Sequence, residues 1–191
     1  AASDVYKRQV DMDEQIYTFE DVINSEKHVE MIDGIVIIED KTTPRHNIAV
    51  TEIASSLKNY ISSKKGSCVV YAENVALYTN ELNNNDGKNY YLPDVMVICD
   101  KNGIKDDGIH TVPKFVAEVT SDATRKFDYN QKLEMYKKIG VEEYWIVDLQ
   151  RNVVFKYVKS EDYIPQYLAH PKLVKVSSYE GLSIDFSTII Q

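Results

Sequence analysis

Two acidic residues interrupt apolar stretches that have the character of buried strands. Asp94 lies in the stretch from residue 90 to residue 99, and Glu118 lies in the stretch from residue 115 to residue 119. A carboxylate is rarely buried without a partner. A divalent cation is one such partner, because magnesium prefers oxygen ligands and two neighbouring strands can offer two carboxylates to one ion. A nearby lysine, such as Lys132, would then stabilise the negative charge that develops when a phosphodiester is attacked.

Both acids also have an interpretation without catalysis. Proline is confined to strand starts, edges and bulges, so Pro93 indicates a local distortion that directs Asp94 toward a site. Without a site, Asp94 is a strand-end aspartate that accepts turn hydrogen bonds. Glu118 is otherwise an edge glutamate that faces water, because Lys114 and Thr120 make the ends of its strand polar.

Three further polar residues have both catalytic and non-catalytic interpretations. Lys132 lies four residues after Asp128 on a predicted helix, so it is either a catalytic lysine or half of a surface ion pair of little energetic value. Glu30 is either a third carboxylate for the same ion or a solvated strand residue. We interpret His46, in the first turn of another helix, as a capping or surface residue. The four histidines lack HxxH or HxxxH spacing and so do not indicate a zinc hydrolase.

Hydrophobic periodicity and turn signals predict the elements that position these residues. The first helix is expected at 18–25, capped by Thr18 with Asp21. The second is expected from Pro44 to Gly66 with Thr43 as its cap. The third is expected at 125–139 and ends at Gly140. Hairpins are expected at 28–39 around Asp33-Gly34 and at 141–158 around residues 149–151. Strands are expected at 67–78 and around Asp94 and Glu118, loops at 83–87 and 100–108, and edge strands at 167–190. This order indicates an α/β fold with a mixed β-sheet, and a doubly wound nucleotide fold is disfavoured because no glycine-rich phosphate loop follows a strand.

Length and composition limit the number of domains and the class of protein. The chain has 191 residues, of which 43% are hydrophobic, and its formal net charge is −8. We expect a disordered leader over residues 1–14 and a single domain over residues 15–191. There is no apolar run of membrane-spanning length and no secretory signal pattern. Cys68 and Cys99 belong to no CxxC pair, so we expect buried reduced thiols in a cytoplasmic protein.

In order and spacing, several segments resemble the Uma family (Uma-two) of restriction-endonuclease-like proteins, within the PD-(D/E)XK nuclease superfamily. The likeness covers roughly residues 15 to 186 and rests on 29–34 (VEMIDG), 44–46 (PRH), 92–95 (LPDV), 118–121 (EVTS), 124–128 (TRKFD), 131–133 (QKL), Tyr136, 140–141 (GV) and 143–148 (EYWIVD).

This resemblance implies a restriction-endonuclease-like core, in which a mixed sheet is flanked by helices. Asp94 and Glu118 would match the metal-binding acids, with the main-chain carbonyl of Val119 as a third ligand, and Glu30 would match the acid from the N-terminal part. The superfamily pattern places a lysine two residues after the second acid, where this chain has Thr120. The resemblance therefore implies that Lys132 substitutes for it from the following helix.

The implied reaction is hydrolysis of DNA with one or two magnesium ions, or manganese in their place. Water attacks in line at phosphorus, and Lys132 orients or deprotonates that water or stabilises the charge on the phosphate. We expect Lys132→Ala to abolish cleavage and to leave folding nearly intact. The alternative is a non-catalytic nucleic-acid-binding or interaction protein that retains the nuclease fold, which the acidic charge and the missing basic tract favour.

Cleavage of both strands of a duplex is most simply achieved by two copies of one site related by two-fold symmetry. We therefore expect a homodimer that uses edge strands or the segment after Tyr167 as its interface. Its two sites are expected to open on one side and to be lined by local basic residues such as Lys126 and Lys132.

Overall fold

A computed structural model describes residues 17–38, 42–79, 82, 89–122 and 124–190. The predicted leader over residues 1–14 and the predicted polar loop at 83–87 lie outside these ranges. Within the described part of the chain, no helix is both long and apolar enough to cross a membrane.

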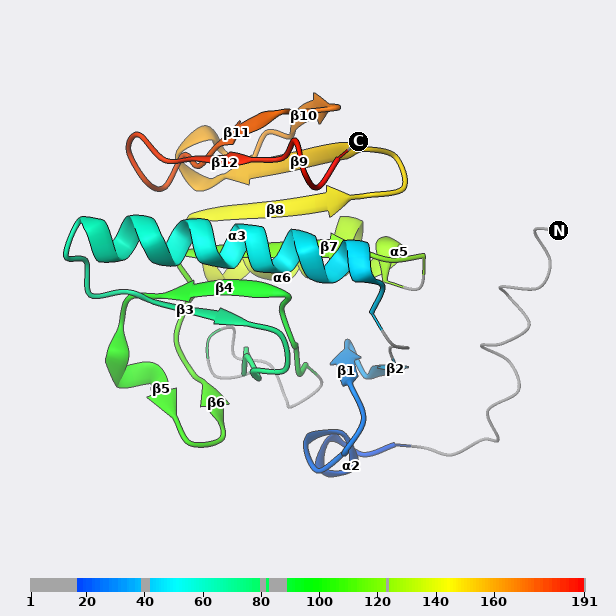
Figure 1. Ribbon diagram of the computed structural model, residues 1–191. Helices are drawn as coiled ribbons and strands as arrows, with labels where there is room; N and C mark the ends of the chain where they lie inside the picture. Colours follow the sequence, from blue (N-terminus) through cyan, green and yellow to red (C-terminus); the bar gives the residue numbers. More distant parts are fainter. Residues whose placement is uncertain (1–16, 39–41, 80–81, 83–88, 123, 191) are drawn as a thin grey trace, which may run out of the picture.

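A six-stranded mixed sheet forms the centre of the molecule (Figure 1). Its order is β10 (Gln166–Ala169), β9 (Val153–Val158), β8 (Glu143–Asp148), β7 (Phe115–Thr120), β4 (Val95–Ile98) and β3 (Val69–Ala72). Only β7 and β8 run parallel, and the other neighbours are antiparallel. The predicted α/β class with a mixed sheet is thus confirmed.

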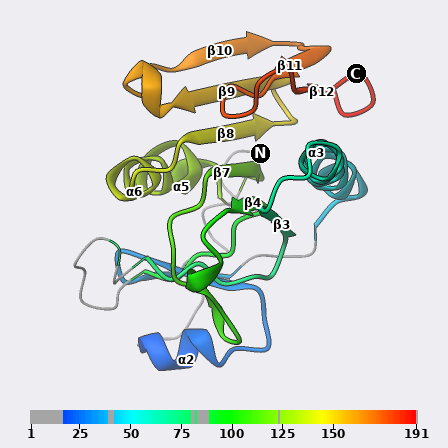
Figure 2. The ribbon, with the colours of Figure 1, turned by 90° about the vertical axis from the view of Figure 1, so that its left-hand side faces the viewer.

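Helices cover both faces of this sheet (Figure 2). On one face lies α3 (Pro44–Ser63), which Thr43 caps at its start through a bond from the His46 amide. The apolar residues of α3 pack with one set of strand side chains, which includes Trp145. On the other face lie α5 (Arg125–Phe127) and α6 (Leu133–Ile139), which pack with the alternate strand residues, including Tyr144. Burial on both faces explains why the central strands are almost uniformly apolar.

The predicted helix over residues 125–139 is one continuous helical segment, but its middle turn is wider than an α-helix. Residues Asp128–Lys132 form a π-helical turn between α5 and α6, and Gly140 ends the segment in the left-handed conformation at φ 85°. Turns of this kind are rare and are frequent at functional sites. This one carries Asp128 and Lys132.

Smaller elements surround the sheet. Below β3 and β4 in Figure 1 lie α2 (Phe19–Ile23), which Thr18 and Asp21 cap reciprocally as predicted, and the hairpin of β1 (Val29–Ile32) and β2 (Ile35–Ile38). Asp33 and Gly34 make its turn, both at positive φ. The remaining pieces are η1 (Lys101–Gly103), β5 (Ile104–Lys105), β6 (Gly108–Ile109), η3 (Lys159–Glu161), β11 (Leu173–Lys175) and β12 (Ser183–Asp185).

The expectation of two reduced, buried thiols is wrong. Cys68 and Cys99 form a disulfide, and both residues are only half buried. The register explains the pairing, because Val69 lies opposite Ile98 in the antiparallel pair of β3 and β4, so the two cysteines continue that ladder by one position. The spacing of the two cysteines in the sequence does not predict this register.

Candidate active site

The two acids that the sequence singled out meet at one end of the sheet. Asp94 immediately precedes β4, and Glu118 lies on the neighbouring β7, where Val95 pairs with Ala117. The Val119 amide donates to Asp94 Oδ2 at 2.6 Å, and Glu118 Oε2 lies 3.4 Å from the Asp94 amide. Each carboxylate therefore reaches the backbone next to the other acid, which holds both at the same end of two adjacent strands.

A buried lysine lies beside Glu118. The Lys132 ammonium is 2.8 Å from Glu30 Oε2, 3.2 Å from Glu118 Oε1 and 3.5 Å from Asp128 Oδ1. The lysine side chain is 2% exposed, and the three acids are exposed by 4% or less. Glu30 is held from the other side by the Leu92 amide, which donates to its Oε1 at 2.7 Å. One ammonium thus joins three carboxylates from β1, β7 and the π-helical turn.

Tyr136 fixes the orientation of Glu118. Its hydroxyl donates to Glu118 Oε1 at 2.7 Å, so this oxygen receives both the phenol and the Lys132 ammonium. The second oxygen, Oε2, faces Asp94. The Glu118 carboxylate is therefore oriented with Oε1 toward Tyr136 and Lys132 and Oε2 toward the Asp94 backbone amide.

The start of the helical segment is tied to the sheet by charged contacts. Arg125 bonds to Asp148 at the end of β8 at 3.1 Å and to Asp122 at 2.6 Å, and its third bond goes to Gln150 at 2.8 Å. Because this end of the segment is anchored, the following π-helical turn presents Lys132 to Glu118.

The electrostatics of the cluster are dominated by burial. Burial raises the pKa of Glu118 well above its usual value, and the nearby Lys132 only partly opposes this effect. Burial likewise raises the pKa of Asp128 to about 6, again against the influence of Lys132. For Lys132, burial acts to lower the pKa, but the attraction of Glu118, Glu30 and Asp128 outweighs it and raises the pKa well above the ordinary value. The lysine is therefore charged, and it is surrounded by more carboxylates than it can neutralise.

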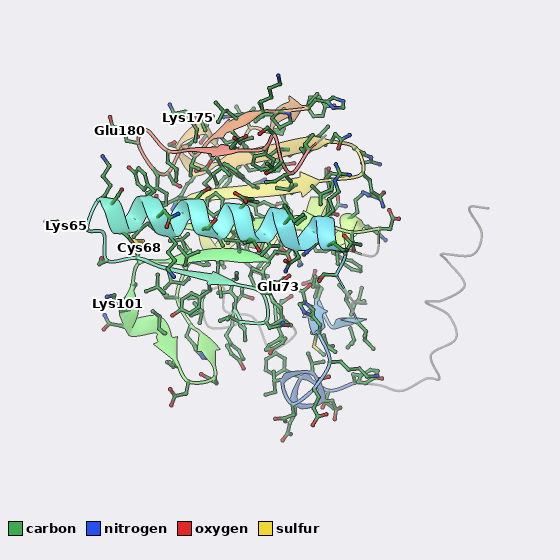
Figure 3. The ribbon with its side chains drawn as sticks, viewed as in Figure 1. Lys65, Cys68, Glu73, Lys101, Lys175 and Glu180 are labelled. Atoms are coloured by element: carbon green, nitrogen blue, oxygen red, sulfur yellow. A yellow bond between two sulfur atoms is a disulfide. The ribbon has the colours of Figure 1, made fainter. Side chains whose placement is uncertain are left out.

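His46 lies at the same end of the sheet, contrary to its interpretation as a capping or surface residue. Its side chain is 12% exposed, with Nε2 3.3 Å from Asp94 Oδ1 and Nδ1 3.8 Å from Glu73 Oε1. One ligand atom from each of the three side chains lies within 4.8 Å of the other two. Figure 3 shows Glu73 just beyond β3, below the N-terminal half of α3, whereas Cys68 lies at the opposite end of β3.

Three sequence-based expectations about Lys132 change with this geometry. Lys132 is not half of a surface pair, and it cannot line a DNA-facing surface, because it is buried. Lys126 is exposed, as that expectation requires. The expectation that Lys132→Ala would leave folding nearly intact is no longer supported, because it assumed that Lys132 is exposed to solvent. Glu73 was missed altogether, because an acid after a short strand has no distinguishing signal until β3 is paired with β4.

Comparisons with known proteins agree with this architecture. The family model for Uma2, described as "Putative restriction endonuclease", matches residues 13–188. A crystal structure from Anabaena variabilis, titled as a putative nuclease belonging to DUF820, superposes with a TM-score of 0.70 at 18% identity and covers 91% of this chain and 97% of that one. The uncharacterized protein sll1609 of Synechocystis is 28% identical over 122 residues, which are 62% of this chain and 65% of that protein.

The fold places this protein in the restriction-endonuclease-like class. More specifically, the chain belongs to the Uma2 family. The alignment with the Synechocystis relative spans less than two thirds of that protein's length.

Proposed function

We propose that this protein is a metal-dependent endonuclease that hydrolyses phosphodiester bonds in DNA, with magnesium or manganese as its cation. The supporting observation is the charge at the end of the sheet. The carboxylates of Glu30, Glu118 and Asp128 lie against the single ammonium of Lys132, and Asp94 adjoins Glu118. A buried excess of negative charge is costly unless protons or a cation neutralise it.

The ligands we assign to the cation are the carboxylates of Asp94 and Glu118 and the main-chain carbonyl of Val119. Their oxygen chemistry fits a hard divalent ion. Such an ion, when bound, polarises the phosphate and lowers the pKa of water. Asp94 and Glu118 would hold it between two adjacent strands, and their fixed orientation costs no reorganisation during the reaction.

Lys132 and Glu30 act as positioning residues in this proposal. The ammonium holds Glu118 Oε1, and Glu30 holds the ammonium in turn, so that Glu118 Oε2 stays directed at Asp94. Direct contact between Lys132 and substrate is not part of the proposal, because the side chain is 2% exposed. The mechanism implied by the family resemblance had Lys132 orient or deprotonate water. In this proposal Lys132 orients the Glu118 carboxylate instead.

The quaternary structure and the compartment are also proposed. A homodimer would place two sites on one duplex. The edge strand β10 and the segment after it carry exposed apolar side chains suited to an interface, with Tyr167 at 60% and Leu173 at 66% exposure. The cytoplasmic location is proposed from the DNA substrate alone, and the Cys68–Cys99 disulfide, which is unusual in a reducing compartment, argues against it.

Cleavage assays with purified protein test the proposal. Labelled single- and double-stranded DNA and RNA are incubated with magnesium, manganese or EDTA, using the wild type, Asp94→Asn and, as control, Lys101→Met at an exposed lysine. We expect DNA scission by the wild type and by Lys101→Met only with a divalent ion, and none by Asp94→Asn. Scission that persists in EDTA or in Asp94→Asn would refute the assignment. Metal-independent DNA binding without scission would favour the non-catalytic alternative.

A further inference from the structure

Asp94 faces potential ligands on two sides. Its Oδ2 accepts the Val119 amide on the Glu118 side, whereas its Oδ1 lies 3.3 Å from His46 Nε2 on the other side. Glu73 approaches the same imidazole at 3.8 Å. The three side chains come from the first turn of α3, the end of β3 and the start of β4, so their convergence depends on the tertiary fold rather than on local sequence.

The ligand atoms of these three side chains suit a cation. Glu73 Oε1 is shielded from solvent, and among the described residues it has no hydrogen-bond donor. An acceptor left in that state costs free energy. The ligand atoms lie within 4.8 Å of one another, whereas two ligands about 2.2 Å from one ion are at most about 4.4 Å apart. Movements of a few tenths of an ångström would therefore close the three side chains around an ion.

The backbone directs Glu73 into this position. Glu73 and Asn74 adopt φ values of 46° and 53°, a left-handed conformation that is unfavourable for a non-glycine residue. The Glu73 amide also donates to the Asp94 carbonyl at 3.0 Å. The end of β3 is thus turned back onto the start of β4, beside the Asp94 side chain.

We propose that His46, Glu73 and Asp94 form a site for a divalent transition-metal ion such as manganese, with the imidazole of His46 as a direct ligand. This inference rests on the proposed function and names the metal class and two further ligands at the same end of the sheet. Imidazole suits iron, nickel, copper and zinc best, whereas magnesium and manganese both favour oxygen ligands. Of these two oxygen-preferring ions, manganese is the transition ion and accepts a nitrogen ligand more readily, so the His46 imidazole should favour manganese over magnesium.

Direct binding measurements test this inference without any substrate. Manganese is titrated into the full chain by electron paramagnetic resonance, and magnesium affinity is obtained by competition. We expect the wild type to prefer manganese by at least 10-fold. Loss of outer-shell partners alone typically weakens metal affinity 10–100-fold, so His46→Ala should weaken manganese binding by about 100-fold or more. Magnesium binding should change less than about 3-fold. Glu73→Gln should weaken both ions, and the exposed His170→Asn should weaken neither.

Folding is checked separately by unfolding each variant and following Trp145 fluorescence. His46→Ala keeps the helix cap, because Thr43 bonds to the residue 46 amide and not to its ring. If His46→Ala binds manganese as the wild type does, while Asp94→Asn does not, the His46 ligand is refuted and the endonuclease proposal survives. Equal wild-type affinity for the two ions, or no binding at millimolar concentration, also refutes the inference. Cleavage in the same buffer then shows separately whether the endonuclease proposal stands.

Discussion

Replacing Lys132 with methionine removes the only permanent cation of the buried cluster while preserving most of the side-chain volume. In the wild type the ammonium lies within 3.5 Å of Glu30, Glu118 and Asp128, and all four side chains are nearly inaccessible to water. Removing one partner of a buried ion pair typically costs about 3–5 kcal/mol, because the remaining charge is left uncompensated. We therefore expect Lys132→Met to lower the free energy of unfolding by at least about 3 kcal/mol at pH 7.5.

Urea denaturation in EDTA, followed by the fluorescence of the buried Trp145, measures this loss. With a slope of roughly 2 kcal/mol per molar urea, the midpoint should fall by at least about 1.5 M. The matched control is Lys126→Met, an exposed lysine of the same helical segment, which should change the unfolding free energy by less than about 0.5 kcal/mol. Adding Glu30→Gln to Lys132→Met should recover part of the loss, since glutamine still accepts the Leu92 amide.

The pH dependence provides an independent check of the same reasoning. Without the ammonium, the pKa values of Glu118 and Asp128 rise further above their usual range, because Lys132 lowers both in the wild type. Protonation then relieves the uncompensated charge, so the stability difference between wild type and Lys132→Met should shrink as the pH falls toward 4. A loss below about 1 kcal/mol at pH 7.5 would show that Lys132 behaves as a surface lysine and would refute the buried-cluster account.

Three further outcomes are expected. Cys68→Ser, or reduction of the wild type, should lower the unfolding free energy by about 3–4 kcal/mol for a loop closed across a separation of 31 residues, and equal urea midpoints with and without reductant would contradict this. Asp128 has a folded pKa of about 6 against 3.8 for the ordinary carboxyl. Its contribution to stability is therefore present below pH 4 and is lost as the pH rises through 6. Asp128→Asn should remove this contribution to the pH dependence of urea midpoints measured in EDTA between pH 4 and 7. Light scattering should find a dimer for the wild type and a folded monomer for Tyr167→Lys, and a monomeric wild type would exclude the proposed interface.

The fold was predictable from the sequence wherever the signal was local. Thr43 and Pro44 start α3, Asp33-Gly34 closes the β1–β2 hairpin, and Gly140 ends the helical segment, because each of these depends on a few neighbouring residues. The apolar runs around Asp94 and Glu118 likewise identified two buried strands. Their pairing as adjacent strands was expected from the hypothesis that both acids share one cation rather than from periodicity.

Other features depend on contacts between residues far apart in the chain, and local patterns do not contain them. The spacing of Asp128 and Lys132 is that of an ordinary surface pair, and only the packing of the helical segment against β7 and β1 makes it a buried cluster. The disulfide depends on the register of β3 with β4. The approach of His46 to Glu73 and Asp94 depends on where α3 crosses the sheet, so a histidine in a first helical turn resembles a simple cap.

The most direct test of the central claim, that the Asp94 and Glu118 end of the sheet hydrolyses phosphodiester bonds, is single-turnover DNA cleavage in ¹⁸O-labelled water. Wild type and Glu118→Gln are compared with manganese present, and the product ends are analysed by mass spectrometry. We expect one ¹⁸O atom in the terminal phosphate of the wild-type product and a rate at least about 100-fold lower for Glu118→Gln, since the variant loses the charge that holds the cation. Equal rates for the two proteins, or product phosphate without ¹⁸O, would contradict the claim.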